Sequence, residues 1–358
     1  MKIIGLIVTL IFISNLSGLD NLLKKSDLRV PKIDYEPRTY ICLHTTEKIN
    51  IDGKGSEKVW INAQWTDLFV DIEGDLKPKP EFDTKVKMLW DDNFMYFYAE
   101  MVEPHLWATL TERDAVIYHD NDFEIFIDPD GDTHNYYELE FNLFGTLWDL
   151  LLTKPYRDGG HAIDAWDVRD IKYALNLDGT LNDPSDIDKG WSIEVAIPWN
   201  VLEEAAGHGG PPVNGEYWKV NFSRVQWDTE IIDGKYIKKN DPEHNWVWSP
   251  QGLIAMHFPE MWGIVDFRIE NLKRHATFKL YENEKWILRQ LYYGMKYYKD
   301  KNKVYPQNLT ELYSFMGIGE LEVIPELKLT QSMFEITLSS EENTKWHINN
   351  NGKLWMGK

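Results

Sequence analysis

The chain has 358 residues, of which 14% are aromatic and 27% are charged, and its formal net charge is −20 at pH 7. This acidity argues against a nucleic-acid partner, because phosphate binding needs a cationic surface, and against docking on anionic membranes. The single cysteine, Cys42, excludes an intramolecular disulfide, and its apolar neighbours predict a buried thiol. We therefore expect neutral ligands or cations as partners.

The first segment in chain order predicts export. Met1-Lys2 precedes an apolar run at 3–13, and small and polar residues follow at 14–18. This pattern is typical of a signal peptide, predicted as residues 1–18, and is too short to span a membrane comfortably; an uncleaved N-terminal anchor is the alternative. The rest of the chain has no apolar stretch long enough for membrane insertion. We therefore expect a secreted, periplasmic or cell-surface protein.

A polar linker or arm, residues 19–39, leads into a β-rich region, residues 40–270. Alternating apolar and polar residues recur there, and turn signals such as Asp-Gly, Lys-Gly and Asn-Gly separate them. Short strands at this rhythm predict an all-β fold, a jelly-roll-like β-sandwich of antiparallel sheets. The predicted strands include 84–90, 94–102, 122–128, 136–142, 147–153, 171–177, 191–197, 217–225 and 263–268.

The chain changes character near residue 271. Apolar residues fall at helical spacing in 283–300, and a second short helix is predicted at 308–315. The segments 333–338 and 345–356 look like a hairpin. We therefore expect residues 271–358 to form a small C-terminal α+β appendage.

The stretch YHDNDFEIFIDPDGDTHNYYELEFN at 118–142 carries the strongest functional signal. It predicts two alternating strands joined by an acidic Asp-Gly turn, with Tyr118, Asp122 and Glu124 at one end. An aromatic ring can stack on the apolar face of a sugar, while carboxylates accept hydrogen bonds from its hydroxyls. The stretch therefore predicts carbohydrate binding.

The turn between these two strands has two interpretations. Asp128, Asp130 and Asp132 place carboxylate oxygens at alternate positions, and Ca²⁺ takes six to eight oxygen ligands, often from such a loop. A solvated hairpin turn is the alternative. The cofactor hypothesis is therefore a structural calcium ion bound by these three residues.

Four motifs then follow one another along the β-rich region. They are Ile51-Asp52-Gly53 with Trp60, FEIFIDP at 123–129, YELEFN at 137–142 and WSIEVAIPW at 191–199. In this order they resemble the family 9 carbohydrate-binding modules and their stand-alone bacterial relatives, over about residues 41–268. The resemblance implies a β-sandwich with one sugar site and structural calcium, and an association with the breakdown of xylan or cellulose.

The resemblance also implies sugar contacts, because in such modules two rings sandwich a sugar while Glu, Arg and Asn side chains bind its hydroxyls. Glu124 lies at the acidic contact position, and Tyr118, six residues earlier, matches one aromatic wall where relatives often have Trp. Arg224 matches a basic contact on a late strand.

The remaining contacts fall in the segment HNWVWSP at 244–250. Asn245 is the matching amide contact and Trp248 the second wall, with Trp246 as its competitor. Both tryptophans would face the same side of a strand, so their spacing leaves this choice open.

Two other functions stay open beside a non-catalytic, secreted carbohydrate-binding protein that supports polysaccharide breakdown. Asp122 and Glu124 could act as the acid and base of a glycoside hydrolase, since alternate residues of a strand lie roughly 6.5–7 Å apart, although carboxylates on one strand do not easily flank a glycosidic bond. The third reading is a scaffold or interaction protein whose sugar site has been lost.

Overall fold

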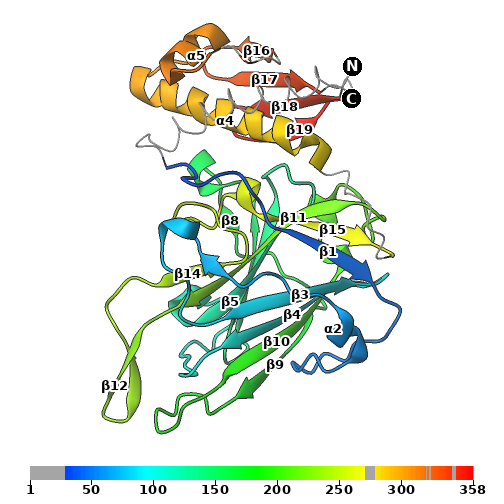
Figure 1. Cartoon of the computed structure of the whole chain (residues 1–358), viewed down its shortest axis with the longest axis vertical. Helices are drawn as coiled ribbons and strands as arrows, with labels where there is room; N and C mark the ends of the chain where they lie inside the picture. The colour runs from blue at the N-terminus through cyan, green and yellow to red at the C-terminus, as the bar shows by residue number, and fades with distance from the viewer. Residues whose placement is uncertain (1–28, 271–278, 320, 322–323, 341–343, 358) are drawn as a thin grey trace, which may run out of the picture. The chain divides into compact units, whose positions relative to one another are not determined.

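The computed structural model describes residues 29–270, 279–319, 321, 324–340 and 344–357 (Figure 1). The predicted signal peptide, residues 1–18, lies outside the described residues, and only 29–39 of the predicted arm lie within them. Among the described helices, none is long and apolar enough to cross a bilayer. One compact unit spans residues 36–276, and a second includes residues 277–358.

A curled sheet of thirteen strands builds the unit of residues 36–276. Its order is β8-β7-β6-β5-β11-β15-β1-β3-β4-β10-β9, and β14 pairs with β11 and with β2. The strand pairs are antiparallel except that β1 runs parallel to both β15 and β3. Figure 1 shows β3, β4, β10 and β9 side by side in one half of this sheet. The strands are β1 (Thr39–His44), β2 (Val70–Asp71), β3 (Thr84–Trp90), β4 (Phe94–Val102), β5 (Asp122–Asp128), β6 (Tyr136–Asn142), β7 (Leu147–Leu152), β8 (Ala162–Ile163), β9 (Lys172–Asp178), β10 (Gly190–Pro198), β11 (Tyr217–Gln226), β14 (His244–Val247) and β15 (Gly263–Arg268).

Short elements connect these strands. A separate two-stranded sheet is formed by β12 (Thr229–Ile232) and β13 (Lys235–Lys238). The helices are α2 (Lys58–Asn62) and α3 (Glu203–Ala206), and the 3₁₀ turns are η1 (Gly74–Leu76), η2 (Ile117–His119), η3 (Tyr156–Asp158), η4 (Trp199–Val201) and η5 (Pro259–Met261).

Alternation along the strands builds one core between the two halves of the sheet. Phe123, Ile125 and Ile127 of β5 point into it, as do Val220 and Phe222 of β11. Residues of β3, β4 and β10 fill the same core from the other half. This arrangement confirms the predicted all-β sandwich. The face of each strand toward this core is its inner face, and the opposite face is its outer face.

Two of the four motifs used for the resemblance, the one at 51–60 and the one at 191–199, meet at one buried carboxylate. Glu194 of β10 accepts hydrogen bonds from the backbone of Asp52 (2.8 Å) and Gly53 (2.7 Å) and from Nε1 of Trp60 (2.8 Å). The Trp60 ring is fully buried. Hydrogen bonds to a buried carboxylate offset its desolvation, so these residues stabilise the sandwich rather than bind a ligand.

The appendage combines two helices with a four-stranded antiparallel sheet, which confirms its predicted α+β class. Asn308 caps the second helix by accepting the Glu311 N–H at 2.9 Å. The hairpin predicted from 333–338 and 345–356 is only part of this sheet, because four strands pair in the order β16-β17-β18-β19. The elements are α4 (Lys279–Asn302), α5 (Leu309–Met316), β16 (Glu326–Leu329), β17 (Phe334–Ser339), β18 (Lys345–Asn349) and β19 (Leu354–Met356).

A loop before β15 covers part of the outer face and contains a half-buried histidine, His257, that predicts acid sensitivity. His257 lies 3.0 Å from the Tyr136 hydroxyl, and burial, followed by the charge of Arg157, lowers its pKa to about 3. Below pH 6.5 the His257 ring therefore binds a proton in the unfolded chain but stays neutral in the folded chain. We expect this residue to cost roughly 2 kcal/mol of unfolding free energy between pH 7 and pH 5.

Urea denaturation at both pH values checks this, with His257→Gln as the comparison because glutamine keeps a polar partner for Tyr136. The variant should lose roughly 2 kcal/mol less than the wild type over this interval. Arg157, which forms an ion pair with Glu260, and the Tyr156 ring also lie close to His257, so only the difference between the two proteins reports on His257. Equal losses in both proteins would contradict the prediction.

Candidate functional site

Strand register places a ring, two carboxyls and a hydroxyl in one row on the outer face. Trp148 of β7 pairs with Glu140 of β6, Glu140 pairs with Glu124 of β5, and Glu124 pairs with Ser223 of β11. Directly opposed residues of antiparallel strands share a face of the sheet. The predicted contact Glu124 therefore lies in the middle of a polar row that crosses four strands.

Tyr118 stands beside this row on η2. Its backbone N–H donates to Oε2 of Glu140 at 3.0 Å, and its carbonyl accepts Nε1 of Trp227 at 2.8 Å. Its ring is 38% exposed and lies 6.2 Å from the Trp148 ring, with the planes tilted by 35°. Burial and then the nearby carboxyl of Glu140 raise the pKa of the phenol, which is consistent with a hydroxyl that lies close to the row.

Four buried carboxyls, Asp122, Glu124, Glu138 and Glu140, gather on this face, and we call them the carboxyl cluster. Burial raises the pKa of Glu124 to about 7, and burial followed by neighbouring carboxylates raises the pKa of the other three well above its usual range. At an effective dielectric of about 20, two unit charges about 4 Å apart repel by about 4 kcal/mol. The cluster therefore needs compensating positive charge to stay ionised.

Arg224 is not part of this site, which corrects the sequence prediction. It lies two residues after Phe222 on β11 and therefore shares the inner face with that residue. Its side chain is only 1% exposed. Its guanidinium forms an ion pair with Glu103 at 2.9 Å and also donates to Gln226 and to the Val102 carbonyl. A sugar hydroxyl cannot reach these donors, because they are buried and already paired within the sandwich.

Trp248 is also wrong as an aromatic wall. It is 1% exposed, its ring lies 5.8 Å from that of Phe222, and it packs in the core. Trp246 is likewise buried in the core, with the Arg224 guanidinium 5.1 Å from its ring centre. Both tryptophans thus lie on the inner face, whereas Tyr118 lies beside the outer face, and the predicted two-walled slot does not form.

Asn245 lies two strands from the cluster. It pairs with Val225, whose N–H donates to Oδ1 of Asp122 at 3.0 Å, so Asn245 belongs to the outer face. It also lines a cavity of about 580 Å³ together with Trp246 and Glu243. The sugar-contact roles of Tyr118, Glu124 and Asn245 stay predictions that this geometry permits.

The acidic turn after β5 has a geometry that suits a cation. Asp128, Asp130 and Asp132 each offer an oxygen within 4.8 Å of the others. The fully buried Asp128 accepts the backbone N–H of Gly131 at 3.2 Å and of Thr133 at 3.0 Å. These hydrogen bonds fix the carboxylate of Asp128 against the backbone of the turn.

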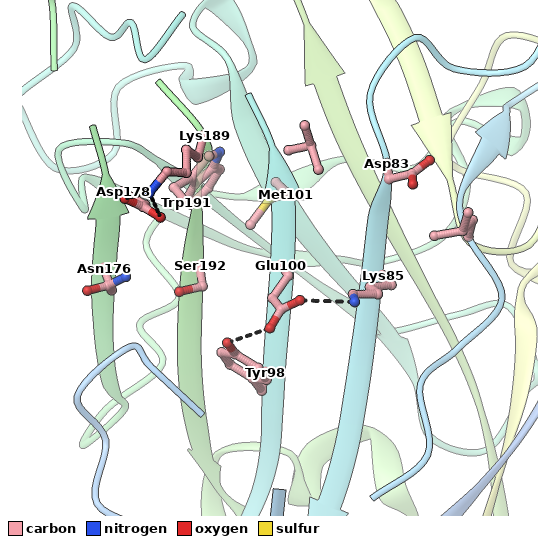
Figure 2. A pocket seen from close by; sticks show the side chains of 13 residues that line it. Asp83, Lys85, Tyr98, Glu100, Met101, Asn176, Asp178, Lys189, Trp191 and Ser192 are labelled. Atoms are coloured by element: carbon pink, nitrogen blue, oxygen red, sulfur yellow. Dashed lines mark hydrogen bonds and ion pairs between the residues drawn. The ribbon is translucent and has the colours of Figure 1, made fainter. Parts of the chain in front are cut away.

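A second polar hollow of about 360 Å³ lies on the other half of the sheet. Figure 2 shows Asn176, Ser192, Glu100 and Lys85 in a row across β9, β10, β4 and β3. Glu100 pairs with Lys85 at 3.1 Å and accepts the Tyr98 hydroxyl at 2.9 Å. None of the residues predicted from the sequence lines this hollow, and four of its charged groups form the pairs Lys85–Glu100 and Lys189–Asp178.

Comparison with known proteins gives short and distant matches to curated enzymes. One is "Exoglucanase XynX" of Acetivibrio thermocellus, 24% identical over 116 residues, or 32% of this chain. Another is "Endo-1,4-beta-xylanase A" of Thermoanaerobacterium saccharolyticum, 23% identical over 121 residues, or 34% of this chain. Each aligned stretch spans only 9% of the relative's length.

One solved structure and one family model also match the chain. A structure described as a putative carbohydrate-binding protein from Bacteroides uniformis ATCC 8492 aligns with a TM-score of 0.48 at 17% identity, over 65% of this chain and 100% of its own. The family model described as "Carbohydrate family 9 binding domain-like" matches residues 51–251, more than half of the sequence. The chain therefore belongs to the carbohydrate family 9 binding domain-like family.

Proposed function

We propose that this protein binds carbohydrate on the outer face, at the Tyr118 ring beside Trp148. The observation that carries the proposal is an exposed ring, held by Glu140, next to carboxyls and a second ring. Family membership supports the ligand class. Trp148, rather than Trp248, then supplies the second aromatic surface.

The chemistry of this face suits a neutral sugar. The apolar face of a pyranose loses contact with water when it stacks on Tyr118, with gains from the hydrophobic effect and dispersion. The carboxyl of Glu243, whose charge also raises the Tyr118 pKa, and the amide of Asn245 lie on the β14 side and can pair with hydroxyls. Glu124 and Glu140 form the floor of the site.

We further propose that binding supports polysaccharide breakdown by keeping the protein on its substrate. The support is the family and the alignment with parts of an exoglucanase and a xylanase. Secretion, which this role requires, rests on residues 1–18 and stays a prediction.

Hydrolysis by the carboxyl cluster is disfavoured by its geometry. Asp122, Glu124 and Glu140 offer oxygens that all lie within 4.8 Å of one another, on one face of adjacent strands. A glycosidase places its two carboxyls about 5–9.5 Å apart on opposite sides of the bond. The cluster leaves no space for a sugar between its members.

We also propose, as the acidic turn suggests, that Asp128, Asp130 and Asp132 hold a calcium ion. Their donor set consists of oxygens alone, which suits Ca²⁺. Such an ion would stabilise the β5–β6 turn at the end of β5 away from Tyr118.

Isothermal titration with cellotriose and xylotriose tests the sugar site. Tyr118→Ala is expected to weaken binding at least about tenfold, which corresponds to about 1.4 kcal/mol, because the stacking surface is lost while the backbone bond to Glu140 remains. Trp65→Ala is the matched control, since this ring contacts Tyr98 and Lys85 beside the other hollow.

The two variants separate the two polar surfaces of the sandwich. If Trp65→Ala abolishes binding and Tyr118→Ala does not, the sugar binds at the hollow of Figure 2 and the proposed site is wrong. If the wild type binds no oligosaccharide on a glycan array that includes cello- and xylo-oligosaccharides, the scaffold interpretation replaces the proposal.

A further inference from the structure

We propose that Asp122, Glu124, Glu140 and Ser223 bind a hard divalent cation of the calcium type on the outer face of β5, β6 and β11. This site is separate from the acidic turn at Asp128. It does not depend on the proposed sugar binding and can be tested without any sugar.

The spacing of the oxygens fits one shared ion. Asp122, Glu124 and Glu140 each offer a carboxylate oxygen, and the three atoms lie within 4.8 Å of one another. Ca²⁺ binds oxygens at 2.3–2.6 Å, so two ligands of one ion can be up to about 5 Å apart. The three side chains can therefore coordinate a single ion without large movements of the strands.

Several oxygens of this site have no hydrogen-bond partner although they are buried. They are Oδ2 of Asp122, Oε2 of Glu124 and Oγ of Ser223, on side chains that are 1%, 4% and 0% exposed. Buried polar atoms are nearly always paired, so three orphaned oxygens on one face indicate a missing partner. The Ser223 hydroxyl, opposite Glu124 in the register, supplies a fourth oxygen ligand.

The neighbouring carboxylate of Asp120 is buried as well, but its oxygens have hydrogen-bond donors. Asp120 is fully buried, yet it accepts the N–H and hydroxyl of Thr109, the N–H of Leu110 and the amide of Asn142, at 2.7–3.0 Å. The strand ends can therefore provide donors to a buried acid. They provide few to the cluster, where Val225 donates to Asp122 and Tyr118 donates to Glu140, while Glu124 interacts with the neighbouring side chains of Ser223 and Asp122.

Protein cations do not neutralise the cluster either. Within the described parts of the chain, no Lys, Arg or His forms an ion pair with Asp122, Glu124 or Glu140. Arg224 is close enough for its charge to interact with Asp122, but its hydrogen bonds go to Glu103, Gln226, Thr84 and Val102. An external cation is the partner that this set of oxygens fits.

Glu124→Gln is the sharpest variant, because it removes one charge and one ligand while keeping the size of the side chain. For the full-length, sugar-free protein we expect Ca²⁺ at a hundredfold excess over Kd to raise the wild-type Tm by roughly 5–10 °C relative to EDTA. The variant should gain less. In EDTA, the variant should melt above the wild type, because repulsion within the cluster is relieved.

Native mass spectrometry counts the ions in parallel. Glu124→Gln should carry one Ca²⁺ fewer than the wild type. The control is Asp130→Asn, in the acidic turn, which should keep the ion of the cluster. If Glu124→Gln binds as many ions as the wild type, or gains the same Tm increase, the cluster holds protons instead and the proposal is overturned.

Discussion

Replacement of Arg224 by methionine should destabilise the protein by about 3–5 kcal/mol, measured as the free energy of unfolding in urea. The guanidinium and its partner Glu103 are each 1% exposed and lie 2.9 Å apart. Without Arg224 the carboxylate of Glu103 stays in the sandwich with the weaker donors Asn121 and the His105 N–H. An uncompensated buried charge costs far more than the pair contributes when it is intact.

A double variant separates this cause from lost packing. Arg224→Met combined with Glu103→Gln removes both charges, and we expect it to recover most of the lost stability, since an apolar side chain can replace a buried ion pair at little cost. Sugar titration completes the test. Should Arg224→Met keep wild-type stability but lose sugar binding, the sequence-based assignment of Arg224 as a hydroxyl contact is restored.

Replacement of Trp248 by alanine should also cost about 3–5 kcal/mol of unfolding free energy, because it empties a large site in a packed core. The ring is so close to β15 that a Cβ at Gly263 would meet it at 2.3 Å. Gly263 is therefore small because the ring occupies the space beside its backbone. Chemical denaturation of Trp248→Ala measures the loss.

The matched comparison for this variant is Tyr118→Ala. Because Tyr118 is 38% exposed, its removal should cost less than about 1 kcal/mol of stability while weakening sugar binding. A two-walled slot would make both aromatic residues ligand contacts. The structure instead makes Trp248 a core residue and leaves only Tyr118 as a proposed ligand contact. A stable Trp248→Ala protein with impaired sugar binding would contradict this division.

The strands were predictable because their alternation is strong and their turns are explicit. The predicted segments 84–90, 94–102, 122–128, 136–142 and 263–268 agree with β3, β4, β5, β6 and β15 residue for residue. Each combines inward apolar residues with a bounding turn or loop, so local physics is enough to define it.

The direction of the late tryptophans was not predictable from HNWVWSP. In this segment Trp246 and Trp248 alternate with Asn245 and Val247, and either set could fill a core. Pairing with β11 decides the matter, since Trp246 lies opposite Arg224 on the inner face. Arg224 itself could have been placed correctly, because it shares the parity of Phe222, a residue that must be buried.

Trp148 and Ser223 were missed because each enters the site only through register. Nothing in LWDLLL at 147–152 marks the tryptophan as a partner of Glu140. The alternation of Asp122 and Glu124 with apolar residues did predict that these two carboxylates share a face. Which strand lies beside that face is a long-range property, and one sequence does not encode it in any short motif.

The parallel pairing of β1 with β15 has a consequence for the order in which the sandwich is completed. Thr39 of β1 aligns with Ile264 of β15, so the hydrogen bonds between these two strands can form only after β15 has been synthesised. Contacts between residues so distant in sequence slow folding, because a long loop must close before they form. During synthesis the emerging N-terminal strand therefore stays without this neighbour until nearly the whole sandwich has left the ribosome, an interval in which a chaperone could usefully shield it.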